Sequence, residues 1–120
     1  MHARVLVCDD ALFMRAMVGE ILARAGYRVV GEAGTGAEAV AAYEALRPDL
    51  VTMDVVMPEM GGIDAVRAIT RLDPQARILM CSAAGQQALV QEALDAGAAD
   101  FVVKPFQASR VLEAAERLLQ

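Results

Sequence analysis

The chain has 120 residues, a mass of 12.7 kDa and a pI near 4.7. Its 16 acidic and 11 basic residues argue against binding to nucleic acid or to an anionic membrane by charge alone. The length suits one domain with a sizeable core, and no signal-peptide pattern precedes the first apolar segment. We therefore expect one soluble, cytoplasmic domain over residues 1–120 that acts on a protein partner.

Short apolar segments alternate with stretches of helical periodicity. Segments of this kind, without polar alternation, are typical of parallel strands buried on both faces. The expected strands begin near Arg4, Arg28, Asp49, Arg77 and Asp100. The intervening helices are expected to end at Gly26, before Pro48, before Pro74 and at Gly97, with a last helix around Val111–Leu119.

This alternation predicts an α/β fold, a doubly wound sheet of five parallel strands with helices on both faces. Right-handed crossovers restrict the topology to such a doubly wound sheet, and the order that we expect for it is the flavodoxin-like 2-1-3-4-5. Polar residues stand where the strands end, namely Asp9-Asp10, Asp54, Ser82 and Lys104. Because the carboxyl ends of parallel strands share one edge, we expect these side chains to meet in one cleft.

Three carboxylates in one cleft require a cation. Two unit charges about 4 Å apart repel by roughly 4 kcal/mol at an effective dielectric constant of about 20. Hard oxygen ligands suit Mg²⁺ or Mn²⁺, with Asp10 and Asp54 as direct ligands and Asp9 behind them or acting through water.

A metal beside Asp54 would let this carboxylate act as a nucleophile toward phosphorus, provided that the phosphoryl charge is neutralised. Lys104, the only lysine of the chain, and the Ser82 hydroxyl would neutralise that charge from neighbouring strands.

Cys8 and Cys81 are expected to stay reduced. A third strand separates the two strands that carry them, and two strand spacings of about 9.6 Å exceed the Cα–Cα distance that a disulfide can bridge.

The motifs resemble those of response-regulator receiver domains, and the resemblance covers the whole chain. The matching segments are Asp9-Asp10, residues 52–60, Cys81-Ser82-Ala83 and Lys104-Pro105-Phe106, and Gly85-Gln86-Gln87 is similar to single-domain chemotaxis regulators. The resemblance implies that Asp54 accepts a phosphoryl group from a phosphohistidine and that Asp9 and Asp10 serve Mg²⁺. On the same basis Val56 joins Asp54 in the metal site, and the Lys104-Pro105 bond is cis.

The resemblance also implies the partners and the output. We expect a monomeric, stand-alone response regulator of flagellar motility that is phosphorylated by a histidine kinase of the chemotaxis type. It would be reset by a phosphatase of the pathway and would bind the flagellar motor switch protein, without a nucleic acid or membrane partner. Its only catalysis would be its own Mg²⁺-dependent phosphorylation and dephosphorylation, carried by Asp54, Lys104 and Ser82. Ser82 and Phe101 are the expected switch residues.

Four positions differ from the usual pattern of that family. Phe101 stands where a tyrosine is common, so a buried ring could report phosphorylation without a hydroxyl group. Ser82 replaces the commoner threonine. Val56 and Ala84 place no polar side chain beside the phosphoryl group, which leaves the lifetime of the phosphorylated state open.

Four alternatives remain at this point. The chain could be a phosphorelay intermediate of the same family. A haloacid-dehalogenase-like phosphatase would use similar chemistry but carries D-x-D on its first strand. A phosphotyrosine-type phosphatase needs an arginine six residues after its cysteine, where this chain has Met14 or Gln87. A flavodoxin-like carrier would need a phosphate loop and aromatic residues, and this chain has no Trp.

Overall fold

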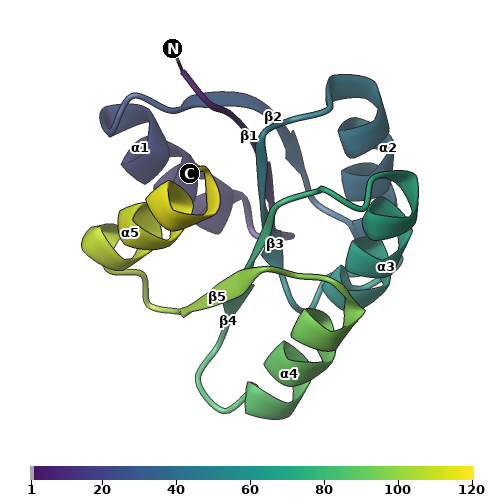
Figure 1. Cartoon of the computed structure of the whole chain (residues 1–120). Helices are drawn as coiled ribbons and strands as arrows, with labels where there is room; N and C mark the ends of the chain where they lie inside the picture. The colour runs from purple at the N-terminus through teal and green to yellow at the C-terminus, as the bar shows by residue number, and fades with distance from the viewer. Residues whose placement is uncertain (1) are drawn as a thin grey trace.

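Strands and helices alternate along the computed structural model, which describes residues 2–120 (Figure 1). The strands are β1 (Arg4–Cys8), β2 (Arg28–Ala33), β3 (Leu50–Asp54), β4 (Ile78–Ser82) and β5 (Asp100–Val103). The helices are α1 (Leu12–Arg24), α2 (Gly36–Leu46), α3 (Gly62–Leu72), α4 (Gln87–Ala96) and α5 (Ala108–Leu118). Within residues 2–120 the strands form one parallel sheet in the order β2-β1-β3-β4-β5, which confirms the predicted fold class and topology.

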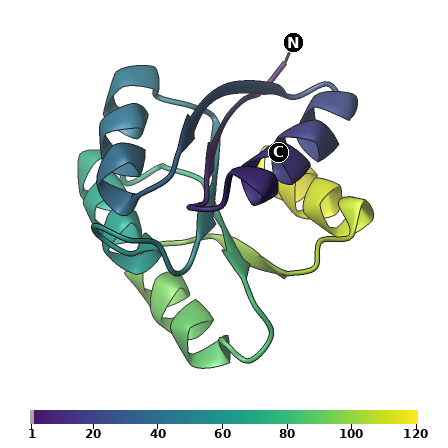
Figure 2. The same cartoon turned by 180° about the vertical axis from the view of Figure 1, so that it is seen from behind.

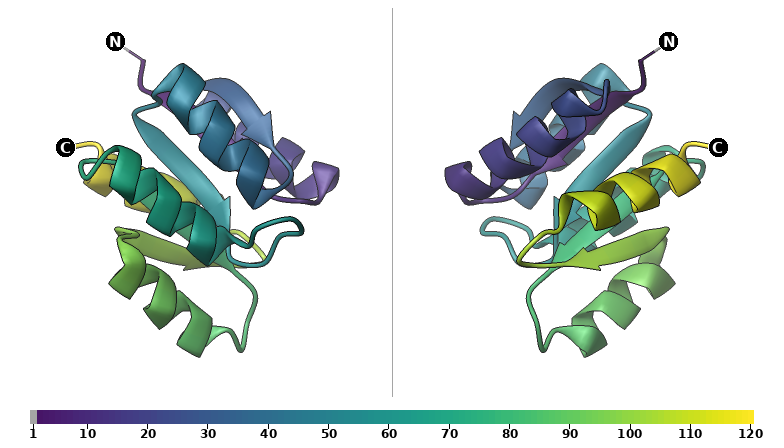
Figure 3. Two further views of the ribbon diagram at one scale, coloured as in Figure 1. Left: turned by 90° about the vertical axis from the view of Figure 1, so that its right-hand side faces the viewer. Right: turned by 90° about the vertical axis from the view of Figure 1, so that its left-hand side faces the viewer.

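The helices cover both faces of the sheet. Helices α2, α3 and α4 lie on one face, and α1 and α5 lie on the other (Figures 2 and 3). Successive residues of β1 point to opposite faces, so Leu6 packs into the core under α2 and α3 while Val7 packs into the core under α1 and α5. Burial on both faces explains why the strands read as continuous apolar segments in the sequence.

Both cysteines are buried and unbridged, as predicted. Strand β3 lies between their strands, and the two side chains also belong to opposite faces of the sheet. Burial raises the pKa of the Cys81 thiol to about 12 and raises that of Cys8 as well. Both thiols therefore stay protonated and act as small apolar side chains.

The helix ends follow their local signals. Gly26 and Gly97 follow α1 and α4 with φ angles of 93° and 126°, a conformation that favours glycine. The Thr35 side chain caps α2 by accepting a hydrogen bond from the Glu38 N–H at 3.0 Å. Because Thr35 is the cap, α2 begins at Gly36. Within residues 2–120, none of the helices is long and apolar enough to cross a membrane.

The start of α3 lies directly against the end of β3. Gly62 donates its N–H to the carbonyl oxygen of Val55 at 3.0 Å, and a Cβ atom at Gly62 would overlap the main-chain oxygen of Asp54. Only a residue without a side chain allows this approach. Gly62 therefore fixes the path of the chain just after Asp54.

We predict that Gly62→Ala lowers the free energy of unfolding by more than about 2 kcal/mol, because the overlap involves rigid main chain on both sides. Gly19→Ala is the matched control, since the nearest atom to its new Cβ, on Val29, is 3.9 Å away. That helical substitution should be neutral or stabilising by up to about 1 kcal/mol. Urea unfolding followed by circular dichroism measures both, and equal stability of the two variants would contradict the prediction.

Candidate functional site

The site lies where the strands end at their carboxyl edge. Asp9 follows β1, Asp54 and Ser82 are the last residues of β3 and β4, and Lys104 follows β5. Main-chain hydrogen bonds hold these ends together: Val55 donates to the Cys81 oxygen at 3.1 Å, and Lys104 donates to the Ser82 oxygen at 2.7 Å. The topology therefore brings residues from four distant parts of the sequence to one edge, as expected for a sheet of this order.

The three predicted carboxylates form one cluster. Asp9, Asp10 and Asp54 each offer an oxygen atom, and these atoms lie within 4.8 Å of one another. Asp9 and Asp54 are buried, with exposed fractions of 4% and 7%, whereas Asp10 is exposed. The cluster is thus closed on the protein side and open to solvent at Asp10.

Lys104 neutralises the buried part of this cluster. Its Nζ lies 3.0 Å from Asp9 Oδ2 and 3.3 Å from Asp54 Oδ1. The sequence placed Lys104 near a phosphoryl group but gave no sign that it pairs with Asp9. The other oxygen of Asp9 accepts a hydrogen bond from the Ala11 N–H at 2.9 Å, so both Asp9 oxygens already have protein partners.

The environment shifts the pKa of Asp54 and of Lys104. Burial, followed by repulsion from Asp9, raises the pKa of Asp54 from 3.8 to about 6 although Lys104 opposes the shift. Burial alone would lower the pKa of Lys104, but its hydrogen bond to Asp9 and the charge of Asp54 outweigh burial and raise it. Additional positive charge nearby would therefore stabilise the ionised form of Asp54.

The donor set fits a hard divalent cation. Oxygen atoms from several carboxylates converge, no sulfur or imidazole group joins this cluster in the described residues, and Asp10 leaves one side open to water. Mg²⁺ commonly takes one or two carboxylates and keeps several waters. Val56, the fourth predicted metal position, lies in the loop after β3 with 56% of its surface exposed and has only main-chain atoms to offer as ligands.

A pocket of about 350 Å³ connects Ser82 with the predicted switch aromatic. The Ser82 side chain is buried, whereas the Phe101 ring on β5 is 37% exposed. Both residues line the pocket, together with Val90 and Leu94 of α4. The ring therefore borders a space that opens toward the end of β4.

Gln86 is a residue near the site that the motif analysis did not single out for a role. Its side-chain oxygen accepts a hydrogen bond from the Ala83 N–H at 2.7 Å, directly after Ser82. This contact orders the loop between β4 and α4.

The Lys104-Pro105 peptide bond is cis, as the resemblance implied.

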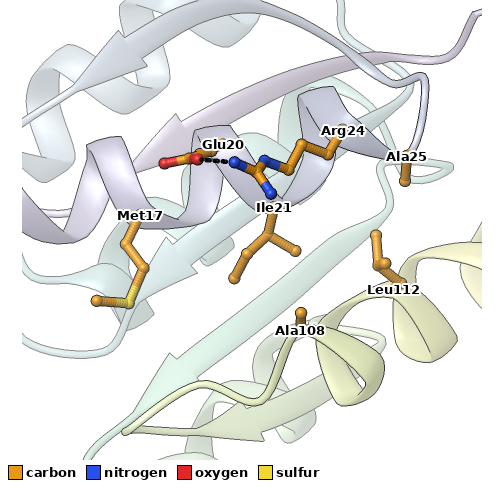
Figure 4. A pocket seen from close by; sticks show the side chains of 7 residues that line it. All are labelled: Met17, Glu20, Ile21, Arg24, Ala25, Ala108 and Leu112. Atoms are coloured by element: carbon orange, nitrogen blue, oxygen red, sulfur yellow. Dashed lines mark ion pairs between the residues drawn. The ribbon is translucent and has the colours of Figure 1, made fainter.

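A second hollow lies away from these strand ends, between α1 and α5 (Figure 4). It has a volume of about 360 Å³ and apolar walls that include Ile21 and Leu112, with the Glu20–Arg24 ion pair at its rim. None of the predicted site residues lines it. The chemistry of the chain is therefore concentrated at the strand ends.

Comparison with known proteins agrees with this geometry. The model of the response regulator receiver domain matches residues 5–116. The chain belongs to the response-regulator receiver family. It is 58% identical to the chemotaxis protein CheY of Thermotoga maritima over 118 residues, covering 98% of each chain. It is 57% identical to CheY of Bacillus subtilis over 119 residues, covering 99% of each chain.

A solved structure of this receiver family is also similar. The crystal structure of the CheX–CheY–BeF₃–Mg²⁺ complex from Borrelia burgdorferi matches with a TM-score of 0.93 and 34% identity, over 98% of this chain and 90% of that chain. The protein is thus a CheY-like response regulator, and its CheY homologues are signalling proteins rather than conventional enzymes. Receiver domains bind Mg²⁺ at an acidic pocket, and this chain has an aspartate cluster that could hold a metal ion. The phosphatase and flavin-carrier alternatives are therefore set aside.

We predict that Asp54→Asn stabilises the metal-free protein at neutral pH. The carboxyl group of Asp54 binds its proton more tightly in the folded protein than in the unfolded chain. Its ionisation therefore lowers the free energy of unfolding. This loss is complete above about pH 6 and disappears at pH values far below 3.8. The pKa rise corresponds to at most about 3 kcal/mol, and we expect about 1 to 2 kcal/mol because water at the open side of the site screens the charges.

Urea unfolding in EDTA at several pH values measures this difference. The gain from Asp54→Asn should be present at pH 7.5 and should shrink toward pH 4. The exposed Asp95→Asn serves as the control and should change stability by less than about 0.5 kcal/mol throughout. A pH-independent effect of Asp54→Asn would contradict the assignment.

Proposed function

We propose that the protein is a cytoplasmic, monomeric chemotaxis regulator that receives a phosphoryl group on Asp54 and changes its surface in response. The observation that supports this function best is the position of Asp54, a buried carboxylate between Asp9, Asp10 and the Lys104 ammonium group. A carboxylate held in this way is strongly disfavoured until more positive charge arrives. The receiver domain would extend over residues 1–120.

The proposed reaction forms one bond and breaks one. An Asp54 carboxylate oxygen attacks the phosphorus atom of a phosphohistidine, the phosphorus–nitrogen bond breaks, and the leaving imidazole nitrogen keeps the electron pair and takes up a proton. Asp9, Asp10, Asp54 and the main chain of Val56 would hold Mg²⁺, which supplies charge neutralisation for the phosphoryl oxygens. The chain has no histidine besides His2 near its start, so the donor is another molecule.

Lys104 and Ser82 would bind the new phosphoryl group. Lys104 already lies 3.3 Å from Asp54, so its ammonium group needs only a small shift to contact a phosphoryl oxygen. Ser82 can donate its hydroxyl hydrogen from the neighbouring strand. Drawing Ser82 toward the phosphate would change the pocket that it shares with Phe101, and the ring would move inward.

The partners follow from the relatives. Two similar proteins are named chemotaxis protein CheY, and the similar structure from Borrelia burgdorferi is a complex with CheX, beryllofluoride and Mg²⁺. We therefore assign a chemotaxis histidine kinase as donor, the flagellar motor switch protein as target, and a pathway phosphatase that resets Asp54. The site itself would catalyse only its own phosphorylation and dephosphorylation.

We predict that acetyl phosphate labels the wild-type protein only when Mg²⁺ is present. Asp54→Asn should abolish labelling because the nucleophile is lost, and Asp10→Asn should require at least about tenfold more Mg²⁺ because a ligand is lost. Intact-protein mass spectrometry counts the added phosphoryl group. Asp95→Asn, an exposed carboxylate of α4, is the control and should behave as wild type. Labelling of Asp54→Asn at the wild-type rate would contradict the proposed acceptor.

We predict that the Phe101 ring reports the activated state. In protein labelled with fluorophenylalanine at its three phenylalanines, beryllofluoride with Mg²⁺ should shift the ¹⁹F resonance of Phe101, which is assigned with Phe101→Leu. In Asp54→Asn the same addition should leave this resonance in place, because the acceptor carboxylate is missing. An unchanged Phe101 resonance in the wild type, at saturating beryllofluoride, would show that the readout lies elsewhere.

A further inference from the structure

Arg15 makes a contact with the aspartate loop that the proposed function leaves unexplained. Arg15 is the fourth residue of α1, and its side chain reaches back toward the start of the helix, as helical side chains do. Its Nη1 donates a hydrogen bond to the main-chain oxygen of Asp9 at 2.6 Å, and its Nε donates to Glu32 at 2.9 Å. The Arg15 side chain is only 18% exposed, so this contact is largely shielded from solvent.

The neighbouring backbone leaves room for this guanidinium group. Gly34 follows β2, and a Cβ atom there would lie 3.3 Å from Arg15 Nη1, closer than comfortable contact. Glu32, whose partner in the β1–β2 register is Val7, holds the other side of the guanidinium group. Arg15 therefore links the end of β1, the end of β2 and the first turns of α1.

The Asp9 oxygen belongs to the peptide group that precedes Asp10. The peptide group that follows Asp10 is held as well, because the Ala11 N–H donates to the Asp9 carboxylate at 2.9 Å. The Asp10 side chain itself is exposed and has no hydrogen-bond partner among residues 2–120. The direction of the Asp10 carboxylate therefore depends on these two peptide planes, and one of them is set by Arg15.

We propose that Arg15 is a positioning residue of the metal site, which fixes the Asp9–Asp10 peptide plane so that the Asp10 carboxylate faces the cation. The inference rests on the proposed Mg²⁺ site. It extends that site to residues that do not touch the metal, in the way that outer hydrogen bonds orient metal ligands in other proteins. Glu32 holds Arg15 and cancels its charge, so the pair orients the loop without repelling the cation at a distance.

The charge balance of the pair determines the design of the test. Arg15→Gln alone would remove a positive charge near the site and so favour Mg²⁺, which would mask a loss of geometry. The double variant Arg15→Gln with Glu32→Gln keeps the net charge and removes the guanidinium group together with the carboxylate that holds it. The matched control is Glu20→Gln with Arg24→Gln, which neutralises a fully exposed ion pair on the same helix.

Mg²⁺ binding by isothermal titration calorimetry is the readout, with no phosphoryl donor present. The Arg15/Glu32 double variant should bind Mg²⁺ about tenfold more weakly than wild type, and the Glu20/Arg24 double variant should bind it equally well. Thermal unfolding in EDTA identifies any general loss of stability. Gly34→Ala provides a second variant that retains both Arg15 and Glu32, and it should weaken Mg²⁺ binding about threefold by displacing the guanidinium group.

The outcomes separate this inference from the proposed function. Wild-type protein that fails to bind Mg²⁺ would overturn the metal site itself. If the wild type binds Mg²⁺ and the Arg15/Glu32 double variant binds it with the same affinity, only the role of Arg15 is overturned. Equal losses in both double variants would also overturn it, because they would reflect stability rather than position.

Discussion

Repulsion between carboxylates at the end of the sheet is the constraint on which the site depends. Asp9 and Asp54 are both buried, and in that environment each charge is costly unless a cation is near. The Lys104 ammonium group meets both of them, at 3.0 and 3.3 Å, and so makes the ionised cluster compatible with folding. Part of the repulsion remains, because the pKa of Asp54 still lies well above its ordinary value.

This residual repulsion connects stability with signalling. The site has more negative charge than Lys104 can neutralise, so a divalent cation would bind to a cluster that is already assembled. A phosphoryl group on Asp54 would then compete with Asp9 for the same ammonium group. On the proposed function, the Lys104 ammonium group would thus have two alternative arrangements, and phosphorylation would shift the balance between them.

The packing of the sheet determines which side chains such a change would affect. Ser82 is buried at the end of β4, while Phe101 on the neighbouring β5 is partly exposed beside a pocket of about 350 Å³. The ends of β3 and β4 are joined by a main-chain hydrogen bond, and the close approach at Gly62 fixes the main chain after β3. A change at Ser82 would therefore act first on the side chains that line the pocket.

The sequence by itself determined the fold class and, because the strands are parallel, the gathering of Asp9, Asp10, Asp54, Ser82 and Lys104 at one edge; the strand order was an expectation taken from known doubly wound sheets. Buried parallel strands require continuous apolar segments, and the end of each segment is visible because a polar residue follows it. The tertiary structure alone decided which charges pair. The contacts of Lys104 with Asp9 and of Arg15 with the Asp9 carbonyl join residues on different elements, and their side-chain directions follow from packing rather than from spacing along the chain.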